Sequence, residues 1–188
     1  MRWYTAEELI LNAQGAMTKD MPGSLIEQRF DQLLLREGPA LMRLAGAYTN
    51  TSSDREDLFQ EIALAIWQAL PNFRGESSER TFLFRIAHNR SLAYLTNRRS
   101  LRIKPDEEER MSDPRLDPEQ ELLQEQERQD LLRAVRRLPV SYRQVITLAL
   151  EGLSYGEMAE VLAVSETNVG TRLNRARQML RSLMENKI

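Results

Sequence analysis

A capped pair of short helical patterns near the C-terminus constrains the fold of this chain more than any other feature. Ser154 and Glu157 have the S-x-x-E spacing of a capping box, which predicts a helix that starts at Tyr155. Val164 and Ser165 then interrupt the apolar pattern, and a serine at that point can cap the next helix with its hydroxyl. The pattern therefore predicts two helices joined by a tight turn.

The second of these helices is expected to have an apolar back and a polar front. Its apolar residues recur every three or four positions, as Val169, Leu173, Ala176 and Leu180. Its opposite side carries polar and basic residues, namely Thr167, Thr171, Asn174, Arg175 and Gln178, with Arg172 and Arg181 on the flanks. This arrangement is typical of a helix-turn-helix whose second helix lies in the major groove of DNA. Ordinary helical bundles also have basic outer faces, so the spacing alone leaves that alternative open.

Composition excludes some classes of protein. The chain has 188 residues, 41% of them hydrophobic, and a mean hydropathy of −0.51, which suits one large or two small globular domains. No apolar run is long enough to cross a membrane, so we expect no membrane insertion. The chain has no cysteine and a single histidine, His88, which excludes disulfides and histidine or thiolate metal clusters. We expect a cytoplasmic protein without a cofactor.

The distribution of helix patterns and charges predicts an all-α fold of two helical domains, at 25–100 and 121–188. The segment between them, 101–120, contains Pro105, Pro114 and Pro118 and is rich in acids, as expected for a linker. Residues 1–24 are a leader in which Thr5 can cap one short helix, although a loosely attached tail is an equal alternative. In the first domain we expect helices at 25–36, 39–48, 54–70 and 79–99, the third opened by a capping box at Ser53.

The third of these helices has an unusual outer face. Gln60, Leu64 and Trp67 lie opposite its apolar side, which consists of Leu58, Ile62, Ala65 and Ala69. An aromatic residue surrounded by polar groups is typical of a protein-docking surface. The alternative is that another helix of the same domain covers Trp67.

The fourth helix interleaves aromatic, amide and basic residues. Such a face suits single-stranded nucleic acid, because bases stack on rings while guanidinium groups bind phosphates. An ordinary central helix is the alternative, and it is favoured for Phe82 and Ile86 taken alone. His88 is expected to be a polar surface residue and neither a metal ligand nor a catalytic base. Arginines also gather at the end of each domain. They can form two phosphate-binding surfaces, and the alternative is that they are solvated helix faces.

We find no motif of an enzyme. The sequence has no P-loop, no G-x-S-x-G, no H-E-x-x-H and no glycine-rich phosphate cradle. Acidic residues are numerous, but no spacing brings two of them together. We therefore expect that the chain is not an enzyme.

Two groups of residues together resemble the extracytoplasmic-function (ECF) class of bacterial RNA polymerase sigma factors. The first group resembles region 2 of that class and consists of Asp54, Asp57, Leu58, Gln60 and Glu61, then 73–75, then 83–89. The second resembles region 4 and consists of Leu138, Pro139, Tyr142 and Arg143, then 151–159, then 175–177. The likeness covers about residues 25–100 and 120–184. Both groups occur in the order that the class has.

The resemblance implies partners and site residues. In the first domain it implies docking on the β′ clamp helices of RNA polymerase core, through Asp57, Gln60, Glu61, Leu64 and Trp67. It implies capture of the opened −10 promoter element by Phe73, Arg85, Asn89 and Arg90. In the second domain it implies recognition of the −35 element by Thr171, Arg172, Asn174 and Arg175, with contact to the β flap. A protein anti-sigma factor is also expected for the class.

Three residues depart from the pattern of the class. Phe82 replaces a common tryptophan, Ala93 an acidic or amide residue, and Gly170 a basic residue of the recognition helix. These departures leave the promoter sequence undefined but do not change the class. We expect an alternative sigma factor that directs promoter-specific initiation of transcription. The alternatives are a stand-alone helix-turn-helix regulator, and a sigma-like protein-interaction module that no longer binds DNA.

Overall fold

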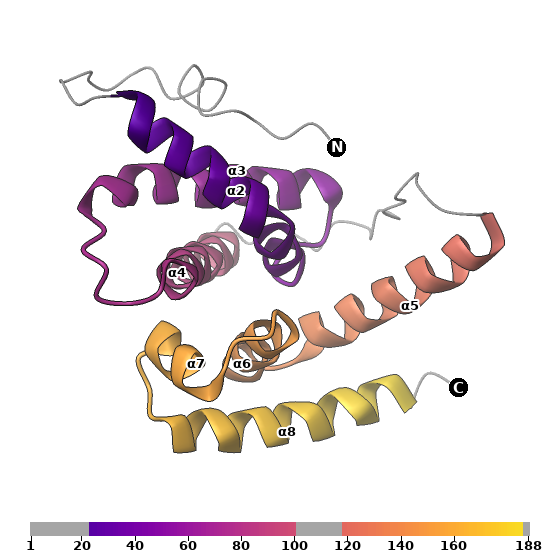
Figure 1. Ribbon diagram of the computed structural model, residues 1–188. Helices are drawn as coiled ribbons and strands as arrows, with labels where there is room; N and C mark the ends of the chain where they lie inside the picture. Colours follow the sequence, from indigo (N-terminus) through magenta and orange to yellow (C-terminus); the bar gives the residue numbers. More distant parts are fainter. Residues whose placement is uncertain (1–22, 101–117, 186–188) are drawn as a thin grey trace.

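The computed structural model describes residues 23–100 and 118–185, which form helices joined by short turns and loops, without a strand (Figure 1). Apolar residues in the sequence recur with the 3.6-residue period of a helix and seldom alternate strictly with polar ones. This pattern favours helices over strands. The elements follow in the order α2 (Gly23–Gly46), α3 (Ser52–Ala69), the 3-10 helix η1 (Leu70–Asn72), α4 (Glu79–Ser100), α5 (Pro118–Arg137), α6 (Val140–Leu150), α7 (Tyr155–Leu162) and α8 (Glu166–Glu185). The all-α fold class is confirmed for this part of the chain.

Helices α2, α3 and α4 form the first helical unit. Their apolar faces meet in a core of fully buried side chains, including Phe30, Leu41, Leu58, Ile62, Leu83 and Phe84. The N-terminal turn of α4 is tied to α2 by Glu79, which accepts hydrogen bonds from Arg29 at 2.7 Å and Arg36 at 3.1 Å. These two hydrogen bonds lower the pKa of Glu79. Packing and ion pairs together fix the direction in which α4 leaves the unit.

Helix α2 is continuous where two helices were expected. The sequence predicted segments at 25–36 and 39–48, but α2 runs unbroken from Gly23 to Gly46 with Pro39 inside it. Proline removes one backbone donor and disfavours a helix interior. Leucines and alanines on both sides of Pro39 are buried in the same core, so tertiary packing holds the helix across it.

The expected capping box of α3 is also wrong by two residues. Thr51, and not Ser53, is the N-cap, and its hydroxyl accepts a hydrogen bond from the backbone N–H of Asp54 at 3.0 Å. The run of Thr and Ser at 51–53 offers three residues that can cap a helix, and local sequence does not choose among them. The core face is as expected, with Leu58, Ile62 and Ala65 buried.

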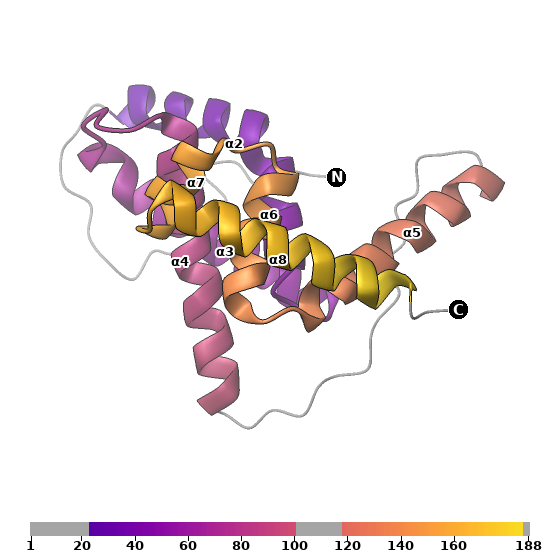
Figure 2. The same cartoon turned by 90° about the horizontal axis from the view of Figure 1, so that it is seen from below.

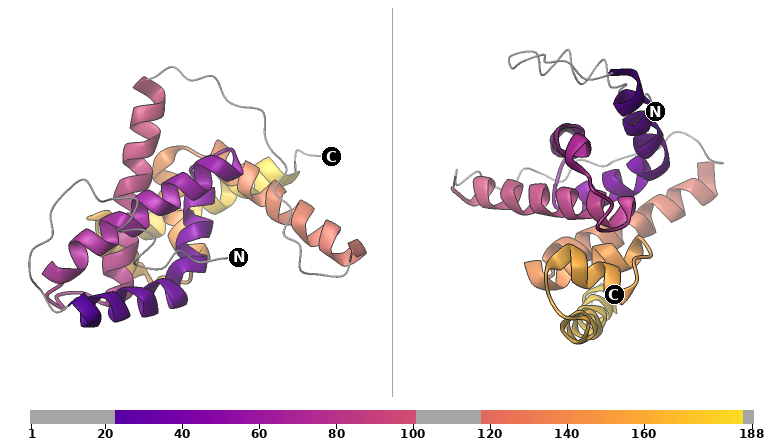
Figure 3. Two further views of the ribbon diagram at one scale, coloured as in Figure 1. Left: turned by 90° about the horizontal axis from the view of Figure 1, so that it is seen from above. Right: turned by 60° about the vertical axis from the view of Figure 1, so that its left-hand side comes forward.

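Helices α5 to α8 form the second unit. Its core contains Val145, Leu148, Met158, Val169 and Leu173. Helix α8 lies across α6 and α7, while the N-terminal part of α5 projects from the body (Figures 1 and 3). The order of the layers in Figure 1 is α2 and α3, then α4, then α6 and α7, then α8, so α4 is the helix of the first unit that faces the second.

Residues 1–22 of the expected leader at 1–24 lie outside the described residues. Residues 101–117 of the expected acidic linker at 101–120 also lie outside them. Among the residues that are described, none of the helices combines the length and the apolar character that crossing a membrane requires. The C-terminal turns of α4 project from the body (Figure 2).

Candidate nucleic-acid and protein interfaces

Helix α3 presents a polar strip on its outer side, made of Asp57, Gln60, Glu61 and Leu64. These residues are three or four positions apart and therefore neighbour one another on the helix surface. Asp57 and Glu61 are exposed, while Gln60 and Leu64 are half-buried. The structure thus brings four of the five expected polymerase-binding residues onto one surface, which we call the α3 strip.

Trp67 continues the α3 strip but is partly covered. Its ring packs edge-on against Phe30 of α2, with 5.2 Å between ring centroids and 77° between planes. Both alternatives from the sequence therefore apply in part, because the indole is half-buried against a neighbouring helix and retains some exposure. One side of Trp67 stabilises the first unit, and the other borders the strip.

Helix α4 carries three of the four residues expected at the −10 element. Arg85 is half-buried, and Asn89 and Arg90 are exposed, one turn further along the helix. We call these three residues the α4 face. Ser78 precedes the helix, and its hydroxyl accepts a hydrogen bond from the backbone N–H of Thr81 at 3.0 Å. That cap sets the start of α4 and hence the register of the α4 face.

Phe73 lies beyond the N-terminal end of the α4 face. Its ring packs against Phe82, with centroids 4.8 Å apart, and the guanidinium of Arg29 lies 5.3 Å from the ring centroid. Phe82 is one helical turn from Arg85, so aromatic and basic groups follow one another along α4. The structure therefore joins Phe73 to the α4 face through Phe82.

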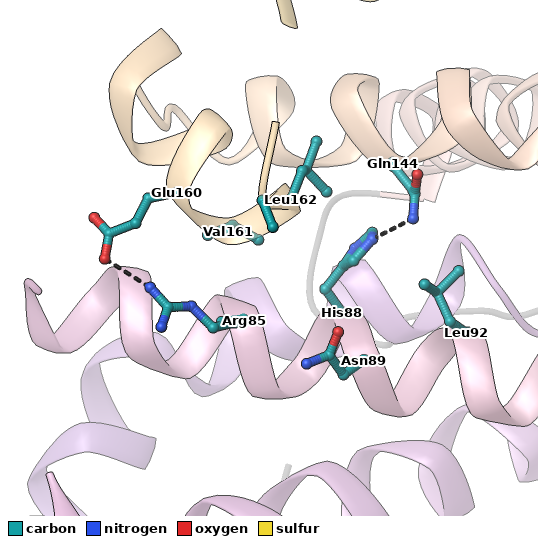
Figure 4. Close-up of a pocket in the computed structure, with 9 residues that line it drawn as sticks. Arg85, His88, Asn89, Leu92, Gln144, Glu160, Val161 and Leu162 are labelled. Carbon is teal, nitrogen blue, oxygen red and sulfur yellow. Dashed lines mark hydrogen bonds and ion pairs between the residues drawn. The ribbon is translucent and has the colours of Figure 1, made fainter. Parts of the chain in front are cut away.

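The expected surface position of His88 is wrong. His88 is 2% exposed, and its Nε2 atom accepts a hydrogen bond from the side-chain amide of Gln144 in α6 at 2.7 Å (Figure 4). Burial lowers the pKa of His88 to about 4. The residue that covers it is 56 positions away, which explains why a local pattern could not reveal the burial.

Several of the arginines gathered at the end of the first unit are paired within the chain. Arg98 donates to Asp54 at 2.7 Å and also to the hydroxyl of Tyr94. Arg85 donates to Glu160 of α7 at 2.6 Å. For these two arginines the charge run is a set of intramolecular ion pairs and not an open phosphate-binding surface.

The second unit contains the predicted helix-turn-helix. The capping box is confirmed, because Ser154 accepts from the backbone N–H of Glu157, and the Glu157 carboxylate accepts from the backbone N–H of Ser154 at 2.8 Å. The hydrogen bond from the Ser154 backbone has the largest effect in lowering the pKa of Glu157, and the hydrogen bond from the Ser154 hydroxyl lowers it further. Ala163 closes α7 in the left-handed conformation with φ of 53°. Ser165 then caps α8 by accepting from the N–H of Asn168 at 3.3 Å, as expected.

Helix α8 presents the four residues expected at the −35 element on its outer side, which we call the α8 face. Thr171, Asn174 and Arg175 are exposed, and Arg172 is half-buried on the flank. Val169, Leu173 and Ala176 are buried on the opposite side, as the apolar stripe predicted. A helix anchored along its back and polar along its front has the form that major-groove recognition needs.

The structure shows no steric need for glycine at position 170 of this recognition helix. A Cβ atom placed there would lie 3.5 Å from the Tyr155 ring, an ordinary contact distance. We therefore expect Gly170→Ala to raise the free energy of unfolding by about 1 kcal/mol, because alanine loses less backbone entropy than glycine in a helix. Thermal unfolding of the two proteins measures this effect. A lower melting temperature for the variant would show that Tyr155 cannot accommodate the added carbon.

Comparison with known proteins places these surfaces in a family. Residues 33–101 match the model of Sigma-70 region 2, and residues 128–180 match that of Sigma-70 region 4. The chain is 33% identical over 164 residues to the ECF RNA polymerase sigma-E factor of Escherichia coli K12, covering 82% of this chain and 85% of that one. It is 31% identical over 162 residues to the RNA polymerase sigma factor NccH of Alcaligenes xylosoxydans, covering 83% and 87%.

Solved structures are similar over both units. A structure of CnrH in complex with the cytosolic domain of CnrY matches with a TM-score of 0.65 and 28% identity, over 96% of this chain and 98% of that one. The sigma factor RpoE of Bartonella quintana, in complex with the anti-sigma factor NepR, matches in fold with a TM-score of 0.66 and 23% identity, over 86% and 99%.

The matches to both sigma-70 regions, one in each helical unit, define the class of protein as a sigma factor. The chain belongs to the ECF RNA polymerase sigma factors. It is accordingly an alternative sigma factor, which directs initiation of transcription by RNA polymerase.

Sequence reasoning missed the residues that join the two units. Gln144, Glu151 and Glu160 all lie in the second unit and make side-chain hydrogen bonds to the first. Glu151 begins a segment that resembles region 4, whereas the other two belong to no motif, and the partners of all three are 56 to 108 positions away. Only the tertiary structure reveals them.

Proposed function

We propose that this sigma factor divides its work among the three surfaces described above. The α3 strip binds the β′ clamp helices of RNA polymerase core, the α4 face with Phe73 binds the opened −10 strand, and the α8 face reads the −35 duplex. The observation that carries the proposal is the α8 face, since it is a polar front on a helix whose back is buried in a capped helix-turn-helix.

The chemistry of the α3 strip suits a protein partner with basic helices. Two exposed carboxylates, Asp57 and Glu61, precede the half-buried Leu64 along the strip, so the strip combines charge complementarity with a small apolar centre. Trp67 borders that centre with its exposed edge. Because its other side packs on Phe30, its removal would disturb the fold as well as binding.

The chemistry of the α4 face suits single-stranded DNA. Arg90 supplies positive charge for phosphates, as does Arg85 once a phosphate replaces Glu160 as its partner, and Asn89 supplies both a donor and an acceptor for a base edge. Phe73 and Phe82 extend the same line with ring faces on which bases stack. The α8 face instead combines Arg175 and Asn174, whose side chains pair in bidentate fashion with guanine and adenine in the major groove.

The remaining expectations complete the proposal. The chain acts in the cytoplasm on RNA polymerase, and it performs no chemistry of its own. Residues 25–100 and 121–188 act as separate domains on the linker 101–120, while 1–24 form a leader, and the second domain also contacts the β flap. The solved relatives CnrH and RpoE are in complexes with CnrY and with the anti-sigma factor NepR, which supports a protein anti-sigma factor for this chain as well.

The test is transcription by sigma-free core polymerase on a library of promoters with randomised −35 and −10 elements. The wild-type chain should select one promoter class. Asp57→Lys with Glu61→Lys should lower transcript yield and core binding at least tenfold, because reversed charges meet the same partner at a cost of several kcal/mol. The matched control, Glu56→Lys with Glu127→Lys, reverses two exposed acids outside the strip and should retain activity.

Two results would contradict the proposal. If both double variants transcribe equally well, the α3 strip is not the polymerase-binding surface. If core polymerase stays silent while the chain alone binds a palindromic duplex tightly, the stand-alone regulator is the correct function.

A further inference from the structure

Arg29 of α2 contacts both ends of the connection between η1 and α4 (Figure 1). Its guanidinium lies over the ring of Phe73, the residue that follows η1, at 5.3 Å from the ring centroid. The same guanidinium donates through Nε and Nη2 to one carboxylate oxygen of Glu79, the first residue of α4, at 3.1 and 2.7 Å. Arg29 therefore links the start of the loop 73–78 to the start of the helix that follows it.

Glu79 braces that guanidinium. Its second carboxylate oxygen accepts a hydrogen bond from Arg36 at 3.1 Å, so two arginines from one face of α2 share one carboxylate. A guanidinium that donates through two nitrogens is held in a defined orientation. Its N–H groups point within the guanidinium plane, so the ion pair with Glu79 and the contact with the Phe73 ring can be made at the same time.

The Phe73 ring is thereby held by two neighbours. Besides Arg29 it contacts Phe82 of α4, with centroids 4.8 Å apart and 47° between the ring planes. The backbone N–H of Phe73 donates to the carbonyl of Leu70 at 3.1 Å, which fixes the main chain at the same point. The ring is only half-buried and keeps an accessible part. An aromatic ring that is already in place loses little conformational entropy when a base stacks on it.

Two simpler roles for Arg29 have to be distinguished from this one. As an ion pair between helices it would contribute little, because Arg29 and Glu79 keep 44% and 34% of their side-chain surface in solvent. As a direct phosphate ligand it would act through its charge alone, and the carboxylate of Glu79 would weaken its effect. Neither role needs the contact with Phe73.

We propose that Arg29 is a positioning residue for strand capture: braced by Glu79, it holds the Phe73 ring where a base of the opened −10 strand stacks on it. The inference rests on the assignment of Phe73 to the −10 strand in the proposed function. Arg29 lies on α2, outside the α3 strip and outside the α4 face. It acts through Phe73, so binding of RNA polymerase core does not depend on it.

The test uses holoenzyme, assembled from core polymerase and this chain, and a fluorescent single strand with the −10 sequence that the wild-type chain selects from the promoter library. Phe73→Ala should weaken strand binding at least about fivefold, the lower limit expected for loss of one base–aromatic stack. Arg29→Gln should weaken it about threefold, as expected for loss of an exposed cation–π contact. The matched control, Arg137→Gln, removes the same charge from an exposed position on α5 and should bind as the wild type does.

Glu79→Gln distinguishes positioning from direct phosphate binding, because the two roles predict opposite changes. Removal of a negative charge should tighten binding of the strand if Arg29 is a phosphate ligand. If Arg29 positions Phe73, loss of the brace should weaken binding about as much as Arg29→Gln does. Glu56→Gln removes the same charge at an exposed position on α3 and should not weaken binding. Tighter binding by the Glu79→Gln holoenzyme would overturn the proposal.

The double variant Arg29→Gln with Phe73→Ala distinguishes positioning from a general structural effect. If Arg29 acts only through Phe73, the double variant should bind the strand as Phe73→Ala alone does, whereas independent effects add. Additive losses would overturn the proposal. Circular dichroism and unchanged affinity for core polymerase check that each variant is folded.

Failure of this inference is distinguishable from failure of the proposed function. If Phe73→Ala weakens strand binding but Arg29→Gln does not, only the positioning role is overturned. If Phe73→Ala binds the strand as tightly as the wild type, the assignment of Phe73 to the −10 strand is wrong, and the positioning role is overturned with it.

Discussion

Replacing Phe84 by alanine is expected to lower the free energy of unfolding of the first unit by about 3–5 kcal/mol. Phe84 is completely buried in the N-terminal half of α4, and the guanidinium of Arg80 lies 5.5 Å from its ring centroid. Its removal leaves a cavity between α4 and its neighbours and also loosens a cation–π contact. Urea unfolding followed by far-ultraviolet circular dichroism measures the change.

The control for this prediction lies on the same helix. Arg90→Ala removes an exposed side chain from α4 and should change the free energy of unfolding by no more than about 0.5 kcal/mol. If Phe84→Ala costs less than 1 kcal/mol, the first unit collapses around the cavity and α4 is not packed as described. Comparing the free energies of unfolding of the two variants distinguishes the buried side of α4 from the exposed α4 face.

Acidification from pH 6.5 towards pH 4 is expected to destabilise the folded structure through His88. Burial lowers the pKa of His88 to about 4 in the folded chain, whereas an exposed histidine has a pKa of about 6.5. Between these values the unfolded chain binds a proton that the folded chain does not. Stability is therefore full above pH 6.5 and is lost as pH falls, by up to about 3 kcal/mol near pH 4.

Urea unfolding at pH 7.0, 6.0 and 5.0 measures this dependence. His88 is the only histidine, so side-chain titration between pH 6.5 and 5.5 is dominated by this residue, before most carboxyl groups are protonated. A His88→Gln variant keeps a polar group near Gln144 and should lose most of the slope in that range. An unchanged slope in this variant would mean that His88 is exposed in solution and that the contact between the two units does not bury it.

The sequence was informative wherever the determining contacts are local. The capping box at Ser154, the cap at Ser165 and the apolar stripe at Val169, Leu173 and Ala176 are set by residues within a few positions of one another. The core face of α3 follows the same helical periodicity. The helix-turn-helix and its exposed front could therefore be predicted, although its role in −35 recognition remains a proposal.

The predictions were wrong where contacts between residues far apart in the sequence determine the structure. The sequence predicted two helices, at 25–36 and 39–48, but buried side chains on both sides of Pro39 hold α2 together despite the lost backbone hydrogen bond. His88 was expected at the surface because its covering residue, Gln144, belongs to another unit. The cap of α3 was misplaced for a different reason, namely that adjacent Thr and Ser residues can each serve as a cap.

The long sequence separation between Arg85 and Glu160 has a consequence for the newly made chain. Translation completes α4 at Ser100, but α7 ends only at Leu162. At about 5–20 residues per second, the ribosome needs roughly 3–12 s to add the intervening residues. During that interval the nascent protein carries an uncovered α4, and we expect polymerase and nucleic acid to compete for it before the C-terminal half has emerged.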